Sequence, residues 1–363
     1  MYNIVEYVKK QLNTFDENDF NSVDSLVLAW MSYVKYPTEI VEQNNMRGIK
    51  IKDLYLAEYF DEMFLNVYDE PDSREIFANL AASPRYRNIE IKQYRVIFNR
   101  NEEKQFAAAT FKLKEGLHYV SFRGTDSTIV GWKEDFNMAY TYSVPAQIEA
   151  VKYLEEVMEN IEGDFLVGGH SKGGNLAVYS VINCEDKYKE RVKKVYSHDG
   201  PGFHSEVLQS EEFLKIANKI ENTVPQSSVF GMILENQENY NIVKSNKLTF
   251  WQHNPFSWMI EGEDFIKVEN LAPSARFFDS TISDWMYSKT REERELFIDT
   301  LFEIFEETDA NTFKDISDDW QKNAPILFEN VSNVDNETKE FVKETVVALI
   351  KIAFKNVPEL FKK

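Results

Sequence analysis

The sequence predicts an α/β fold, in which a mostly parallel central sheet is flanked by helices and helical segments are added at both ends of the chain. The first observation is an alternation between residues 146 and 220, where short apolar runs typical of strands separate longer runs typical of helices. The second is a group of three β-type runs between residues 94 and 122, joined by short polar turns. The third is composition: of 363 residues, 43% are hydrophobic and 14% aromatic, which provides for a large core and excludes a disordered chain.

The predicted elements follow one another in a definite order. Residues 1–90 are mainly helical, with one helix over 74–82 that ends before Ser83-Pro84. Strands are expected at 94–98, 105–113, 117–122, 164–167 and 192–197, and helices at 146–160, 171–182 and 211–220. After about residue 265 apolar residues recur at helical spacing among many charges. We therefore expect a helical N-terminal segment over 1–90 that packs on the core, an α/β core over 91–262, and a helical C-terminal extension over 263–363.

Charge and cysteine content restrict the partners and the location. The chain has 41 Lys and Arg against 61 Asp and Glu, a net charge of −20, and such a chain repels phosphate backbones, so we expect no nucleic-acid partner. Cys184 is the only cysteine, which excludes an internal disulfide and a CxxC metal pair. Residues 1–10 do not resemble a signal peptide, and the apolar run at 346–354 is too short for a membrane span. We expect a cytoplasmic protein without integral membrane association; its oligomeric state is left open.

The most informative segment is Gly169-His170-Ser171-Lys172-Gly173, which follows an apolar strand and precedes a helix-forming run. A GxSxG pattern in this setting is typical of a sharp turn that exposes the serine hydroxyl above the sheet, with glycines where side chains would collide. The free N–H groups and the dipole of the following helix favour an oxyanion there. We interpret Ser171 as a nucleophile; the alternative is a serine that only caps the helix.

A nucleophilic serine needs a base, and only five histidines are available: His118, His170, His198, His204 and His253. His118 lies within a predicted strand, and the side chain of His170 should diverge from the hydroxyl of its neighbour. His198 and His204 come too early for the order serine, acid, histidine. His253 follows an apolar run, where we expect a strand to end in a loop, and it is the predicted base. The alternative is a loop histidine without a role.

The acid that orients the base should lie between Ser171 and His253, where the only aspartates are Asp186 and Asp199. Asp186 belongs to a charged run typical of a solvated helix end. Asp199 ends a predicted strand, and functional groups of α/β folds gather at the carboxyl ends of strands. We therefore expect Asp199 to be the acid, with Glu235 as the weaker substitute. The alternative for Asp199 is an aspartate that only stabilises the following glycine turn.

The oxyanion formed during acyl transfer needs backbone donors. One should be the N–H of Lys172, the residue after the nucleophile. The second should come from a loop after an earlier strand, and Thr125 in the polar turn after residues 117–122 is placed to offer its N–H and its hydroxyl.

These segments resemble the class 3 lipase branch of the α/β-hydrolases. The resemblance rests on Phe122-Arg123-Gly124-Thr125-x-Ser127 with Trp132 and Asp135, and on Gly169 to Gly174 some 45 residues later. The strings at 198–203, 224–228 and 252–258 are similar, more narrowly, to an uncharacterised bacterial lipase-like family. The resemblance covers about residues 117–260.

The resemblance implies an α/β-hydrolase fold over 91–262, Ser171 as nucleophile, His253 as base, and Thr125 and Lys172 as oxyanion donors. It also implies a lid over 129–142, for which packing on the sheet is an equal alternative. One position departs from the pattern: Asn222 stands where class 3 lipases carry their acid, two residues before a Val-Pro pair.

The expected function is that of a serine esterase or lipase-like hydrolase, which cleaves a carboxylic ester of a small or lipid-like molecule through an acyl-enzyme at Ser171. No HExxH, P-loop or GxGxxG motif is present, so we expect neither a metal nor an organic cofactor. Two alternatives stay open. One is an acyltransferase on the same scaffold, and the other is a non-catalytic binding protein that has kept the fold.

Overall fold

The computed structural model describes residues 1–44, 47–65, 67, 69–99, 101–102, 104–125, 138, 143–228, 231, 240–247, 249–272, 290–306, 339–340 and 342. An eight-stranded sheet runs through this part of the chain, and its strands lie side by side in the order of the sequence. They are β1 (Ile49–Lys50), β2 (Glu90–Asn99), β3 (Lys104–Lys114), β4 (Leu117–Phe122), β5 (Asp164–His170), β6 (Val192–His198), β7 (Ile220–Pro225) and β8 (Tyr240–Val243).

The two halves of the sheet differ in direction. The pairs from β1 to β4 are antiparallel, and the predicted polar turns join β2 to β3 and β3 to β4 as hairpins. The pairs from β4 to β8 are parallel, and helices lie in the chain between β4 and β5, between β5 and β6, and between β6 and β7. A second, two-stranded sheet pairs β9 (Ile260–Glu261) with β10 (Asp264–Phe265). The arrangement confirms the predicted α/β-hydrolase fold.

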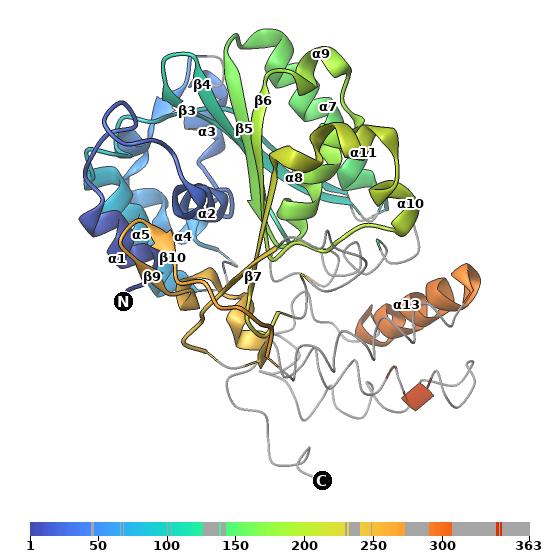
Figure 1. Ribbon diagram of the computed structural model, residues 1–363. Coiled ribbons are helices and arrows are strands. Elements are labelled where there is room, and N and C mark those ends of the chain that lie inside the picture. Colours follow the sequence, from blue (N-terminus) through green and yellow to red (C-terminus); the bar gives the residue numbers. More distant parts are fainter. Residues whose placement is uncertain are drawn as a thin grey trace.

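Helices cover both faces of the large sheet (Figure 1). A parallel crossover is almost always right-handed, so strands added one after another in the same direction send their helices to one face. That face carries α7 (Pro145–Asn160), α8 (Lys172–Asn183) and α11 (Glu211–Ile216), which pack on side chains such as Phe165 and Val167. The opposite face would stay bare, and the N-terminal helices α1 (Ile4–Lys10), α2 (Ser22–Met31) and α5 (Glu70–Ala82) cover it, packing on residues such as Leu166.

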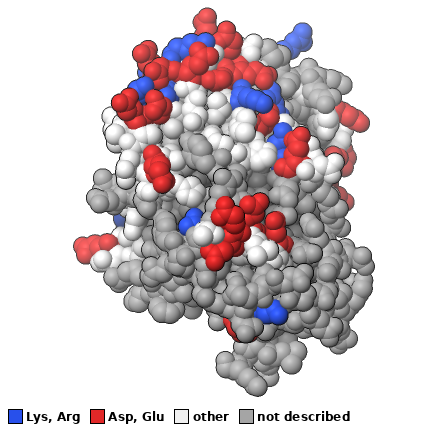
Figure 2. All heavy atoms as spheres, turned by 90° about the vertical axis from the view of Figure 1, so that its right-hand side faces the viewer, with Lys and Arg blue, Asp and Glu red and all other residues white. Residues whose placement is uncertain are grey.

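The remaining helices are short, apart from α13. They are α3 (Thr38–Asn44), α4 (Phe60–Met63), α9 (Asp186–Lys189), α10 (Ser205–Leu208) and α13 (Arg291–Glu306), with 3₁₀ turns η1 (Ile51–Leu54), η2 (Ala57–Tyr59), η3 (Ala217–Lys219), η5 (Thr249–His253) and η6 (Pro255–Ser257). No helix among the described residues is long and apolar enough to cross a membrane. On the face shown in Figure 2, basic side chains lie among acidic ones. Ion pairs among the described residues include Lys187–Glu185 at 3.3 Å and Lys215–Asp186 at 3.2 Å.

Two predicted elements were wrong in part. The helix expected over 211–220 ends at Ile216, and after the 3₁₀ turn the chain enters β7 at Ile220. His253 was expected where a strand ends, but it is the last residue of the 3₁₀ turn η5. This turn is held by Gln252, whose side chain accepts from the Ser227 N–H at 2.8 Å and whose carbonyl accepts from the Trp258 indole at 2.7 Å. The division into parts at residues 90 and 262 stays a prediction.

Candidate active site

The predicted site residues gather at one edge of the sheet because β4, β5 and β6 are parallel and end there together. Phe122 pairs with Gly169 and His170 pairs with His198, so the residues that follow each strand emerge side by side. These are the turn that contains Thr125, the serine at 171 and the aspartate at 199. Thr125, Ser171 and Asp199 are all buried, with exposed fractions of 3%, 8% and 0%.

Ser171 occupies a strained turn between β5 and α8. Its φ of 58° and ψ of −135° lie outside the regions that side-chain-bearing residues prefer. Although Ser171 stands at the N-cap of α8, its side chain makes no hydrogen bond to the helix N–H groups. The interpretation of this serine as a mere helix cap is therefore wrong. Such strain persists only where the surroundings impose it, which is common at functional sites.

Two glycines permit the close packing around this turn. A Cβ at Gly173 would lie 2.1 Å from the Phe122 carbonyl oxygen and 2.9 Å from the Gly124 nitrogen. A Cβ at Gly124 would lie 2.2 Å from the Tyr33 hydroxyl oxygen, 2.6 Å from the His170 carbonyl oxygen and 3.0 Å from Ser171 Cβ. The loop after β4 therefore touches the serine turn directly, as an oxyanion loop must.

Replacing Gly124 with Ala is accordingly expected to lower the reactivity of Ser171 without unfolding the protein. The new methyl group has to displace either the Tyr33 ring or the backbone at His170, and a shift of about 1 Å at a catalytic group costs on the order of 10²-fold in rate. The rate of labelling by a fluorophosphonate, with circular dichroism as the check on folding, measures the effect. Gly116→Ala is the control: its φ of 71° strains an alanine, but no atom lies within 4 Å of the added Cβ, so labelling of Ser171 should stay unchanged. Unchanged labelling of Gly124→Ala would contradict the packing argument.

Asp199 and His253 are joined by a short hydrogen bond. The His253 Nδ1–H donates to Asp199 Oδ2 at 2.6 Å, and the carboxylate side chain is fully buried while the imidazole keeps 20% exposure. Two further donors reach Asp199 Oδ1, the Ser228 hydroxyl at 2.5 Å and the Gly231 N–H at 3.1 Å. With three donors the buried carboxylate is satisfied on both oxygens, and because Nδ1 carries the proton, His253 Nε2 is the unprotonated nitrogen of the ring in its neutral form.

The backbone at Asp199 is also unusual. Its φ is 51°, in the left-handed region, and its N–H donates to the Thr223 carbonyl at 2.8 Å across to β7. Asn222 lies within β7, paired with Ser197, one position before the end of β6. The aspartate therefore comes from the end of β6, while the residue at the usual class 3 position stays within its strand.

Lys172 contributes its backbone to the site and its side chain to the core. It is the first residue of α8, so its backbone N–H belongs to the first turn of the helix, directly after the serine. Its side chain is fully buried, and Nζ donates to the Gln105 carbonyl at 3.1 Å, at the start of β3. This buried contact explains why a lysine occupies a position where an apolar residue is common: it bonds a strand carbonyl below the turn.

Several expectations lie outside the described residues. They are the weaker acid Glu235 and, apart from Met138, the lid expected over 129–142. Met138 is buried and close to Gln147. Among the residues that the structure describes, no group of three or more His, Cys, Asp or Glu side chains is arranged to hold a metal ion.

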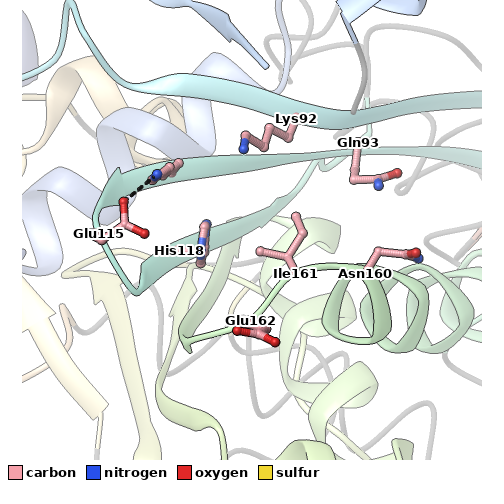
Figure 3. A pocket seen from close by; sticks show the side chains of 8 residues that line it. Lys92, Gln93, Glu115, His118, Asn160, Ile161 and Glu162 are labelled. Atoms are coloured by element: carbon pink, nitrogen blue, oxygen red, sulfur yellow. Dashed lines mark hydrogen bonds and ion pairs between the residues drawn. The ribbon is translucent and has the colours of Figure 1, made fainter. Parts of the chain in front are cut away.

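His118, one of the histidines that the sequence analysis did not select as the base, lies far from this site. His118 is at the start of β4, the opposite end of the sheet from Ser171, in a pocket of about 260 Å³ that it shares with Lys92 and Glu162 (Figure 3). Its ring stacks on Phe165 with centroids 5.2 Å apart, and burial lowers its pKa to about 4. It therefore stays neutral and serves the packing of the sheet.

Sequence reasoning missed the partners that hold the acid and the base. Ser228 and Gly231 bond Asp199, and Tyr33 and His170 lie against the serine turn. Ser228 stands in one of the strings that carried the family resemblance, so that string was the available signal. Nothing in the local sequence around Tyr33 points to the site, because Tyr33 and His170, which it contacts, are 137 residues apart in the chain.

A family model described as Mbeg1-like matches residues 80–303, more than half of the chain, and this range includes Ser171, Asp199 and His253. The chain belongs to the Mbeg1-like family.

Solved structures similar to this Mbeg1-like protein include three lipases at low identity. A fungal lipase in an inhibitor complex is 13% identical and covers 60% of this chain and 75% of its own, with a TM-score of 0.35. The native propeptide complex of Rhizomucor miehei lipase is 12% identical over 58% of this chain and 70% of its own, with a TM-score of 0.33. M37 lipase is 12% identical over 57% and 68%, with a TM-score of 0.34. Comparison with curated protein sequences gave no match.

Proposed function

We propose that this Mbeg1-like protein is a serine hydrolase that cleaves carboxylic esters through an acyl-enzyme at Ser171. The observation that carries the proposal is the buried Asp199–His253 hydrogen bond of 2.6 Å beside a serine in a strained turn between a strand and a helix. Neither feature benefits stability: the turn costs conformational energy, and a fully buried carboxylate costs desolvation. Both are what nucleophilic catalysis by a serine requires.

The proposed reaction has two steps. In the first, His253 Nε2 takes the proton of the Ser171 hydroxyl while Oγ attacks the ester carbonyl. The backbone N–H groups of Lys172 and Thr125 stabilise the oxyanion, and the protonated imidazole returns the proton to the leaving alcohol as the C–O bond breaks. In the second step water attacks the acyl-enzyme with the same base, which releases the carboxylic acid and restores the serine. Asp199 holds the tautomer and stabilises the charged imidazole throughout.

The proposed substrate is a small or lipid-like ester, and the protein is proposed to act in the cytoplasm without a metal or an organic cofactor. The substrate class rests on the site alone, because a serine nucleophile can be acylated by any ester whose carbonyl reaches Ser171 and the oxyanion donors. Whether water or an alcohol accepts the acyl group depends on how the site excludes water.

Labelling with a fluorophosphonate tests the proposal. We expect the full-length protein to form one covalent adduct, which mass spectrometry of its peptides locates at Ser171, and we expect Ser171→Ala to remain unlabelled. A screen of 4-nitrophenyl esters of increasing chain length, with added alcohol as a competing acceptor, then separates hydrolysis from acyl transfer. A folded wild-type protein that neither labels nor cleaves any ester would contradict the proposal and favour a non-catalytic binding role.

A further inference from the structure

His170 connects the serine turn to the segment that carries His253. Its Nε2 lies 2.9 Å from the backbone carbonyl oxygen of His253, and the two imidazole rings have centroids 4.6 Å apart. A carbonyl oxygen only accepts hydrogen bonds, so Nε2 carries the ring proton and donates. The residue immediately before the nucleophile is thus bonded to the main chain of the residue that we propose as base.

Tyr33 contacts the second ring nitrogen of His170, Nδ1. Its hydroxyl lies 3.3 Å from His170 Nδ1 and 3.4 Å from the His170 carbonyl oxygen. Since Nε2 holds the proton, Nδ1 is an acceptor, and the tyrosine O–H is the donor that suits it. Trp30, on α2, stacks on the Tyr33 ring with centroids 4.8 Å apart and thereby supports it.

The charge state of His170 suits this position. The ring is buried, with 3% exposure, and burial, together with the nearby His253, holds its pKa well below the usual value. It therefore stays neutral over the range in which esters are assayed. A neutral ring next to His253 does not repel the imidazolium that forms during catalysis, whereas a second cation at this distance would.

We propose that His170 is a positioning residue for His253: its Nε2–H holds the backbone carbonyl of His253, and the Tyr33 hydroxyl fixes the tautomer that makes this possible. This inference rests on the proposed function. Asp199 controls the rotation of the His253 ring through its side chain, and His170 controls the place of its main chain. His253 is therefore held at two points: Asp199 holds its side chain, and His170 holds its backbone carbonyl.

Two substitutions at position 170 separate the hydrogen bond from the packing. His170→Gln places an amide N–H close to where Nε2 stood, while His170→Met fills a similar volume without a donor. We expect His170→Met to lower kcat for a 4-nitrophenyl ester by about 10²-fold with little change in KM, because the base is displaced. His170→Gln should recover most of the loss, and Tyr33→Phe should lower kcat about tenfold, the equivalent of one lost hydrogen bond.

The hydrogen bond between His253 and Asp199 offers a readout that does not depend on turnover. A proton in so short a charge-assisted bond gives a far-downfield ¹H resonance, identified by its loss in Asp199→Asn. We expect this resonance to broaden or move in His170→Met and to be retained in His170→Gln. The matched control is His118→Met, which removes another buried histidine at the far end of the sheet and should change neither kcat nor the resonance.

The outcomes distinguish this inference from the proposed function. A wild-type protein without esterase activity or labelling would refute the function, yet the resonance would still report on His170. An active wild type, with His170→Met equal to it in kcat and in the resonance, would overturn the positioning role alone. Equal losses of kcat in His170→Gln and His170→Met with an unchanged resonance would also overturn it, and an unchanged kcat in Tyr33→Phe would overturn the step assigned to Tyr33.

Discussion

Replacing Asp199 with Asn is expected to lower kcat by about 10⁴-fold while the protein stays folded. The amide is nearly the same size as the carboxylate, so the contacts with Ser228 and Gly231 keep their places. An amide group facing His253 Nδ1 offers its N–H as readily as its oxygen, which favours the tautomer that protonates Nε2 and so disables the base. Steady-state hydrolysis of 4-nitrophenyl butyrate measures the loss.

Two control substitutions identify the acid. Asp186→Asn changes the other aspartate between Ser171 and His253, an exposed residue that pairs with Lys189 at 3.1 Å, and should leave kcat unchanged. Asn222→Asp restores an acid at the usual class 3 position. In the Asp199→Asn background it should recover no activity, because Asn222 lies within β7. Recovery of activity in that double variant would show that our assignment of Asp199 is wrong.

The second large effect concerns the anchoring of the N-terminal helices. Arg85 and Asp24 form an ion pair at 2.6 Å with both side chains fully buried. The Asp24 carboxylate also accepts from the Tyr7 hydroxyl at 3.2 Å and from the Tyr86 hydroxyl. The Arg85 guanidinium donates in addition to the backbone carbonyls of residues 13, 18 and 19, at 2.7 to 3.0 Å. This network joins α2 to the loop that precedes it and to the chain after α5.

Arg85→Met should lower the free energy of unfolding by about 3–5 kcal/mol, because it leaves Asp24 charged and buried without its partner. Urea unfolding followed by circular dichroism measures the change. The double variant Asp24→Leu with Arg85→Met should lose less than the single one, since no uncompensated charge remains. Arg74→Met is the control: its ion pairs with Asp61 and Glu70 are largely exposed and screened by solvent, so their loss should change the stability little. A loss below that of the control would contradict the argument.

The part of the fold that the sequence predicted well is the part with strong hydrophobic patterns. β3 to β6 are mostly buried along their length, α7 buries one face at helical spacing, and α8 is buried at every residue except Asn183, so their apolar patterns are readable in the sequence. β7 and β8 were not predicted. The first half of each is only partly buried, in Ile220 to Asn222 and in Tyr240 and Asn241, and such short runs lack a clear pattern.

For the candidate site, the sequence indicated residues but not their contacts. Ser171 could be recognised because a strained turn demands glycines at fixed positions around it. Asp199 and His253 were reached by exclusion, and the structure places their side chains 2.6 Å apart, although the local structure expected for His253 was wrong. His170 and Tyr33 were beyond prediction, since their contact depends on how the N-terminal helices lie against the sheet.

The strands of the large sheet lie side by side in the order of the sequence, and this order affects how the chain can fold during its synthesis. Every residue of α2 is buried, and its partner surface includes β5, which follows about 140 residues later. At a synthesis rate of roughly 5–20 residues per second, β5 is synthesised about 7–28 s after α2, and the apolar surface of α2 lacks this partner until then. During this interval α2 can pack only against α1, the chain around α5 and the early antiparallel strands. We therefore expect the nascent chain to need chaperones that bind exposed apolar helices until β5, the strand that ends at the serine turn, has emerged from the ribosome.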